Sequence, residues 1–161
     1  MKKINLRIIT ILSGLVVSAF LFPGCEKPPQ PEQDFDLNVS LSGGKSAGFI
    51  KFRQDPDAAK IVDLDVKVYH LAANHDYLLQ RAVDAVNVVD GDCTSTTWLT
   101  LGKGLTPQSI HTDNYGNGGE MLWRDVSAVP SGSKFDIHFQ IIDAVSLTVV
   151  LTSDCYHYTV R

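Results

Sequence analysis

Residues 62–68 read Val-Asp-Leu-Asp-Val-Lys-Val, with an apolar side chain at each even-numbered position and a charged one at each odd-numbered position. Successive side chains of a strand point to opposite faces, so this pattern predicts a strand with one face in the core and one in water. The same alternation occurs at 35–41 and at 135–141, and a shorter strand is expected at 49–53. The folded part of the chain is therefore expected to be all-β.

Turn residues separate these segments. A Gly- and Ser-rich stretch at 42–48 and the sequence at 55–57, Asp-Pro-Asp, are typical of turns. A turn near 143–146 would lead into a second strand at 147–151. After Cys155 the apolar positions change phase, which predicts a bulge or a break in the strand. The tally is about eight strands, and no segment has an unambiguous helical pattern.

Residues 77–89 fit two descriptions. Apolar residues recur at helical spacing, and Asp76 could cap the start of a helix. The segment also fits a strand with two mixed faces and Arg81 in its middle. The pattern alone leaves both open.

The residues before this segment favour the strand. Leu71-Ala72-Ala73-Asn74-His75-Asp76-Tyr77 resembles the tyrosine corner of fibronectin type III and immunoglobulin-like sandwiches. In those domains the Tyr hydroxyl bonds the backbone a few residues upstream. Leu71 and Tyr77 match the motif, and Ala73 stands in place of its Pro. The resemblance implies an Ig-like antiparallel β-sandwich of about eight strands, with extra strands or long loops in the stretch that follows.

Residues 1–24 have the layout of an export signal. Lys2, Lys3 and Arg7 precede an uncharged run at 8–22. A spanning helix needs ~20 apolar residues, so this run is short for that purpose. A basic start, an apolar run of this length and a small residue at its exit indicate a signal peptide. An uncut membrane anchor is the alternative.

The end of this segment, Phe22-Pro23-Gly24-Cys25, resembles the lipobox of bacterial lipoproteins. In that family the Cys is acylated and becomes the mature N-terminus. Gly24 and Cys25 fit the pattern, while Phe22 and Pro23 depart from it. Ordinary signal-peptidase cleavage after Ala19 is the competing interpretation.

The resemblance implies three parts: a signal peptide (1–24), a lipidated Cys25 with a linker (25–34), and a β-sandwich domain (35–161). The linker is proline-rich and polar, which suits an extended tether. We expect an exported protein of the bacterial cell envelope, held by its acyl chains as an outer-membrane lipoprotein that faces the periplasm or the cell surface.

Charge narrows the range of partners. Removal of residues 1–24 leaves 11 of the 14 basic residues against all 18 acidic ones, a formal net charge of −7. Nucleic acid is therefore not an expected partner. The acidic balance also opposes electrostatic attraction to anionic lipid, so the acyl chains would form the membrane link.

Three cysteines are an odd number for an exported protein. If Cys25 carries lipid, Cys93 and Cys155 remain, and export permits a disulfide between them. Two separate buried thiols are the alternative.

No set of catalytic residues emerges. The five histidines are scattered, and no Gly-x-Ser-x-Gly elbow occurs. We expect no enzyme activity and no cofactor, with a weak Ca²⁺ site as the one exception. Asp113 and Glu120 bracket an oxygen- and glycine-rich loop of the kind that binds Ca²⁺. Such loops are also ordinary turns.

A recognition surface is expected on the loops. Asp90, Asp92, Tyr115 and Trp123 lie in or beside the longest irregular stretches, and Tyr and Trp are favoured binding anchors. Solvated connectors are the alternative reading of these loops. Trp98, between Thr and Leu residues, is expected in the core.

The hypothesis for function is a lipid-anchored, non-enzymatic binding or structural module that contacts a glycan or an envelope protein. The alternative is an envelope or extracellular hydrolase on a β-sandwich scaffold. Fold alone does not choose between these classes.

Overall fold

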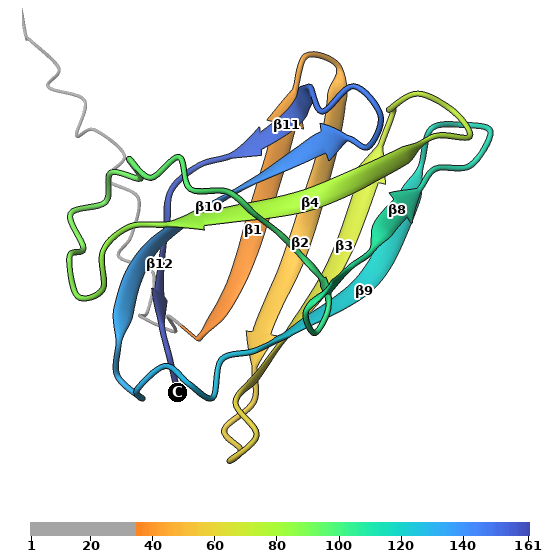
Figure 1. Ribbon diagram of the computed structural model, residues 1–161. Helices are drawn as coiled ribbons and strands as arrows, with labels where there is room; N and C mark the ends of the chain where they lie inside the picture. The colour runs from red at the N-terminus through yellow and green to blue at the C-terminus, as the bar shows by residue number, and fades with distance from the viewer. Residues whose placement is uncertain (1–34) are drawn as a thin grey trace, which may run out of the picture. The chain divides into compact units, whose positions relative to one another are not determined.

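The computed structural model describes residues 35–161, which form one hydrogen-bonded sheet of twelve strands and, over that range, no helix (Figure 1). The signal peptide at 1–24, the lipidation of Cys25 and the linker at 25–34 lie outside the described residues. The part of the chain that is described contains no helix long and apolar enough to cross a membrane.

The strands follow the chain in this order: β1 (Asp36–Gly43), β2 (Ser46–Gln54), β3 (Ile61–Tyr69), β4 (Asp76–Val83), β5 (Leu99–Thr100), β6 (Gly102–Lys103), β7 (Thr106–Pro107), β8 (Ser109–His111), β9 (Gly118–Asp125), β10 (Lys134–Asp143), β11 (Val149–Ser153) and β12 (Tyr156–Thr159).

The first three strands form an antiparallel meander. Val39 of β1 pairs with Ile50 of β2, which pairs with Val66 of β3. All three side chains are fully buried. The alternation that predicted the strand at 62–68 thus places its apolar face in the core and its charged face outward.

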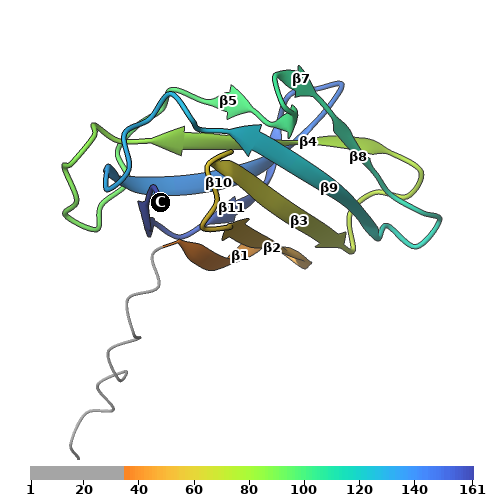
Figure 2. The ribbon, with the colours of Figure 1, turned by 90° about the horizontal axis from the view of Figure 1, so that it is seen from below.

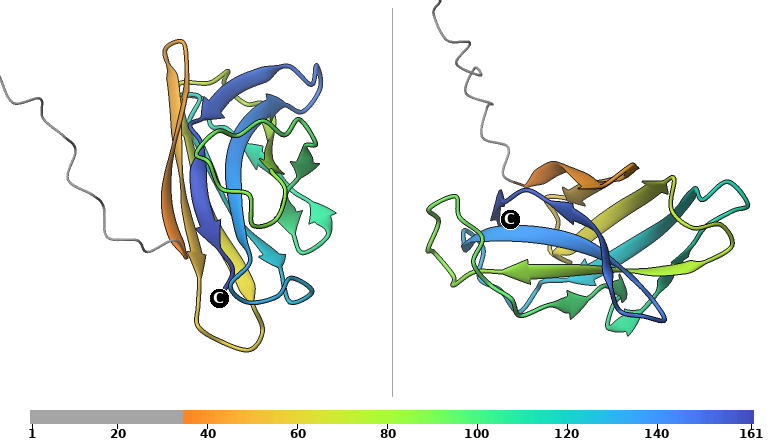
Figure 3. Two further views of the ribbon diagram at one scale, coloured as in Figure 1. Left: turned by 90° about the vertical axis from the view of Figure 1, so that its left-hand side faces the viewer. Right: turned by 90° about the horizontal axis from the view of Figure 1, so that it is seen from above.

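The sheet continues from both edges of this meander. Beyond β3 lies β9, with Leu64 opposite Leu122. Beyond β1 lies β11, followed by β10 and β4, with Ile141 opposite Leu79. Figures 2 and 3 show the result: the sheet curls until β4 and β10 face β1–β3 across the core.

A short extended segment nearly closes the sheet. β5 pairs with β4, with Thr100 opposite Gln80, and the Leu101 N–H donates to the Leu79 carbonyl at 2.8 Å. β6 then pairs with β9 in parallel, with Lys103 opposite Trp123. This closing segment (residues 99–104) bridges β4 and β9, which do not pair directly.

The all-β prediction is confirmed, and the Ig-like sandwich is not. A sandwich consists of two separate sheets packed face to face. Here hydrogen-bonded neighbours run from β4 through β10, β11, β1, β2 and β3 to β9, so a single barrel-like sheet encloses the core. Four short strands between 99 and 111 raise the number above the eight expected. The ambiguous segment at 77–89 is a strand as far as Val83.

The tyrosine corner is present within this different sheet. Tyr77 is buried, and its hydroxyl accepts a 3.0 Å hydrogen bond from the backbone N–H of Ala72. The predicted contact is confirmed. This hydrogen bond holds the connection between β3 and β4 in place, and such a connection is needed in a sandwich and in a closed sheet alike.

The predicted disulfide joins Cys93 and Cys155, whose Cα atoms lie 5.4 Å apart. Cys155 lies between β11 and β12, where the change of apolar phase predicted a break. Closing a loop of 62 residues stabilises the fold by about 4 kcal/mol in the chain-entropy model.

This bridge holds the loop at 84–98 against the outer face of β10. The buried carboxylate of Asp136 accepts hydrogen bonds from the backbone N–H groups of Asp90 and Gly91, both at 2.9 Å. The Trp98 ring packs on His138 with 4.6 Å between centroids. Trp98 therefore lies outside the sheet, and its expected place in the core is wrong. The loop gives β10 a second buried face.

Replacing Tyr77 by Phe should lower the free energy of unfolding by about 1 kcal/mol, because one buried hydrogen bond is lost and the ring is kept. Tyr115→Phe is the matched control, since Tyr115 is 76% exposed. Urea denaturation followed by tryptophan fluorescence measures both. Equal stability of Tyr77→Phe and wild type would show that the corner contributes nothing.

Candidate functional site

Two arginines occupy inward-facing positions of the sheet. In β4 the alternation that buries Tyr77 and Leu79 brings Arg81 to the same face. In β9 it buries Leu122 and brings Arg124 to the same face. Each arginine stands where the strand pattern calls for an apolar side chain.

The closing segment places the two arginines on either side of itself. Arg81 lies opposite Leu99 of β5, and Arg124 follows directly on Trp123, the partner of Lys103 in β6. Two strand spacings separate β4 from β9, roughly 10 Å. Arg124 donates from Nη1 to the carbonyl of Gly104 at 3.2 Å.

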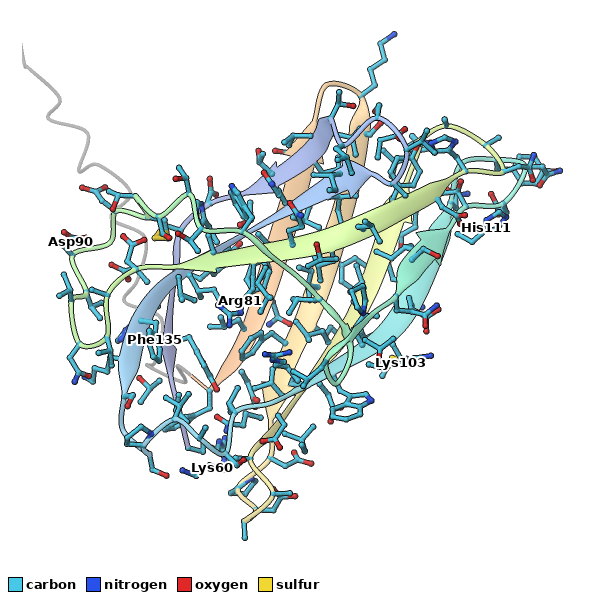
Figure 4. The ribbon with its side chains drawn as sticks, in the orientation of Figure 1. Lys60, Arg81, Asp90, Lys103, His111 and Phe135 are labelled. Carbon is cyan, nitrogen blue, oxygen red and sulfur yellow. A yellow bond between two sulfur atoms is a disulfide. The ribbon has the colours of Figure 1, made fainter. Side chains whose placement is uncertain are left out.

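Both side chains border a cavity of about 80 Å³ inside the sheet. Eleven of its fourteen lining residues are apolar, and the others are Arg81, Arg124 and Tyr158. The apolar lining comes from β2, β3, β4, β10 and the segments that flank them: Phe52, Val62, Leu64, Val83, Leu101, Val126, Val129, Phe135, Ile137, Phe139 and Val160. Figure 4 shows Arg81 and Phe135 toward the end of the sheet at which Lys60 lies.

Arg81 lacks a counter-charge. Within residues 35–161, no carboxylate or other hydrogen-bond acceptor contacts its guanidinium. Burial lowers the pKa of Arg81, and the positive charge of Arg124 lowers that pKa further. A guanidinium carries five N–H donors, and leaving them without acceptors in a poorly solvated space is unfavourable.

Tyr158 completes the polar part of the lining. Its hydroxyl donates to the side-chain oxygen of Gln54 at 2.9 Å, and this oxygen also accepts from the backbone N–H of Arg161. Burial raises the pKa of the Tyr158 hydroxyl well above its usual range, against a smaller opposing effect of the Arg81 charge. The hydroxyl is therefore neutral, and the cavity carries the two arginine charges.

A turn covers the end of the cavity. Val126 and Val129 of this turn belong to the lining. Lys60 fastens it twice: its carbonyl accepts from the Val126 N–H at 3.0 Å, and its Nζ donates to the Val129 carbonyl at 3.1 Å. A shallower hollow lies next to the turn and shares Val129 and Phe135 with the cavity. This end is therefore where the interior comes closest to solvent.

The four residues expected on a recognition surface lie elsewhere. Asp90 and Asp92 are exposed on the loop at 84–98, where the Asp92 N–H donates to the Asp90 carboxylate at 3.1 Å. Tyr115 is exposed on the loop between β8 and β9, which Figure 1 places at the opposite end of the sheet. Trp123 lies on the outer face of β9, and its ring would be 2.8 Å from a Cβ on Gly104. None of the four lines the cavity.

The two residues expected to bind Ca²⁺ have other contacts. The Asp113 carboxylate accepts from the backbone N–H groups of Tyr115 and Asn117, at 2.8 and 2.9 Å. Glu120 forms an ion pair with Lys103 at 2.8 Å. Residues 35–161 contain no group of three or more His, Cys, Asp or Glu side chains that could hold a metal ion. The Ca²⁺ site stays a prediction.

The arginine pair was not predicted from the sequence. The pattern places Arg81 in the middle of a strand but does not show which way its side chain points, because Gln80 and Ala82 on the other face are covered too. The sequence did contain a signal for Arg81, because the period of two places it on the same face of the strand as Tyr77, Leu79 and Val83. Arg124 follows Leu122 in the same way.

Comparison with known proteins identifies no relative: no family model matches the chain, and neither a curated protein nor a solved structure does.

Replacing Arg81 by Met should raise the free energy of unfolding by about 1 kcal/mol, because a charge without an acceptor leaves the apolar interior. Arg53→Met is the matched control and should be destabilising. Arg53 donates to the carbonyls of Leu37 and Phe52 at 2.8 and 2.7 Å. Denaturant titrations of the two variants and wild type measure whether each substitution raises or lowers the free energy of unfolding. A loss of stability in Arg81→Met would show that its charge is already compensated.

Proposed function

We propose that this protein is a non-enzymatic binding module that takes a small, largely apolar molecule into the interior of its sheet. The observation that carries the proposal is the cavity, whose lining is apolar apart from three side chains. Binding sites for small molecules are typically concave and apolar with a few placed polar groups.

The cavity differs from an ordinary packing defect. Protein interiors are close-packed, and a single water needs only ~10–15 Å³ measured in this way. A space of about 80 Å³ exceeds that several-fold. Apolar cavities stay dry and take up apolar ligands, because transfer of apolar surface out of water is favourable. An occupant would thus gain the contacts that the lining residues lack.

The cavity is a stronger candidate than the loops. Asp90 and Tyr115 lie on loops at opposite ends of the sheet, so the expected surface would be divided (Figure 1). A glycan or envelope-protein partner on either loop has no built site to support it. The hydrolase alternative has no specific contact in its favour either: within residues 35–161, the rings of His75 and His111 each contact a carboxylate, and the His75 ring also packs on Tyr77.

The proposal includes the location inferred from the N-terminus. Acyl chains on Cys25 would hold the protein at a membrane of the cell envelope, and the linker at 25–34 would give the sheet freedom to reach its ligand. Molecules with long apolar parts partition into membranes, so a binding module beside one meets them at high local concentration.

Blocking the cavity should abolish binding. In calorimetric titrations of the purified full chain with octanol and with octanoate, wild type should bind at least one ligand. Val83→Trp should lose this binding, because Val83 lines the cavity and the larger ring fills it. Val129→Trp, in the turn, serves as a second blocking variant that leaves the strands unchanged.

The control for these variants is Val145→Trp, on a turn where Val145 is 81% exposed. It should bind like wild type. Circular dichroism verifies that each variant is folded. Undiminished binding in both folded blocking variants would place the ligand outside the cavity and refute the proposal.

Anchoring is tested separately. Cys25→Ser should abolish acylation, because the thioether that carries the lipid cannot form. Detergent phase partitioning together with mass spectrometry of the mature N-terminus measures this. A wild-type chain that begins at Phe20 without lipid would contradict the lipoprotein assignment.

A further inference from the structure

We infer that the ligand of the cavity is a single-chain amphiphile with an oxyanion head, a carboxylate or a phosphate, held between Arg81 and Arg124 with its tail against the apolar lining. This inference rests on the proposed function and specifies the chemical class of the ligand.

Neither arginine of the pair forms an ion pair within the described residues. Charged side chains that face a core are normally paired or bound to an ion. Two Lys–carboxylate ion pairs and two His–carboxylate contacts occur within residues 35–161, and none involves Arg81 or Arg124. No carboxylate of the described residues therefore pairs with either guanidinium, although hydrogen bonds from Ser127 and, to a lesser extent, the Arg124 charge lower the pKa of the exposed Asp125 carboxyl. An anionic ligand would supply the missing counter-charge.

The two arginines are placed to bind one anion together. Both arginines border one cavity from strands that flank the same closing segment. The contact from Arg124 to Gly104 uses one N–H and directs that guanidinium along the segment. Most donors of both groups are left for an occupant. Guanidinium forks match carboxylate and phosphate oxygens, and such charge-assisted bonds are stronger than neutral ones.

The charge of the arginine pair is opposite in sign to the net charge of the chain. The chain has 18 acidic and 14 basic residues. The paired positive charges in the interior thus oppose the overall balance of the protein. The two positive charges also repel each other, and, beyond the effect of burial, the Arg124 charge therefore lowers the pKa of Arg81. An oxyanion between them would relieve this repulsion.

The apolar walls of the cavity indicate that the anion carries an apolar tail. Phe52, Ile137 and Phe139 line the same cavity and offer no hydrogen bond from their side chains. A free inorganic anion would gain nothing from these walls. A cavity of about 80 Å³ is also too small for a lipid with two long chains. A single short or medium alkyl chain attached to the anion suits the apolar walls, while its head group suits the two arginines.

The experiment compares four probes of matched structure on the purified full chain: octanoate, octyl phosphate, octanol and inorganic phosphate. Calorimetric titration gives each dissociation constant. At least one of the two amphiphilic anions should bind tenfold or more tightly than octanol, and inorganic phosphate should bind more weakly than either. Preference between octanoate and octyl phosphate identifies the head group.

Arg81→Met and Arg124→Met should each reduce the preference for the anion over octanol at least fivefold, because each removes a guanidinium that contacts the head group and leaves the apolar walls in place. Arg53→Met is the matched control. Its guanidinium bonds backbone carbonyls outside the cavity, so the preference should not change.

The outcomes separate the two proposals. If octanol and both anions bind equally, the cavity binds apolar molecules but the inference about the head group is overturned. If inorganic phosphate binds as tightly as octyl phosphate, the tail is not recognised, and the inference of an amphiphilic ligand is overturned. If none of the three eight-carbon probes binds, both the proposed function and this inference fail.

Discussion

The whole arrangement depends on how the gap between β4 and β9 is closed. These strands are the two ends of an otherwise continuous ladder, and residues 99–104 link them next to the cavity, with one strand pair on each side. Further along, β8 pairs with β4, and Thr112 bridges to Gly118 at the start of β9. Trp123 packs over Gly104, whose φ of 68° is accessible chiefly to glycine. Without this segment the interior would be a groove open to water. With it, the apolar lining becomes a cavity, which Arg81 and Arg124 border from the two strands that flank the segment.

The site and the stability of the protein make opposing demands. A core built for stability alone would have apolar residues at Arg81 and Arg124 and no space between them. The molecule offsets this with features outside the cavity, among them the Cys93–Cys155 bridge and the loop that covers the outer face of β10. Such a division is common where binding requires groups that folding disfavours.

The strands were largely predictable from the sequence, and their arrangement was not. At 62–68 the period of two fixes the strand and its buried face. The same pattern suits a sandwich and a closed sheet, because both have one wet and one dry face. The strands at 99–111 are only two or three residues long, too short for a detectable period. The arginine pair escaped notice for a related reason. Gln80 and Ala82 on the outer face of β4 are covered as well, so the outer positions of this strand are not reliably polar.

The strand order has a consequence for the route by which the chain folds. β1, β2 and β3 are neighbours in both sequence and space, so this meander needs only short loop closures. The pairings Leu64–Leu122, Leu79–Ile141 and Leu41–Ser153 join distant parts of the chain. Topologies dominated by such pairings fold slowly, since loop entropy is lost before the contacts form. Until β9 arrives, the meander exposes the unpaired edge of β3, a strand that other chains could extend. Asp63, Asp65 and Lys67 alternate with apolar residues along β3, and charged side chains on an edge strand oppose its pairing with another chain.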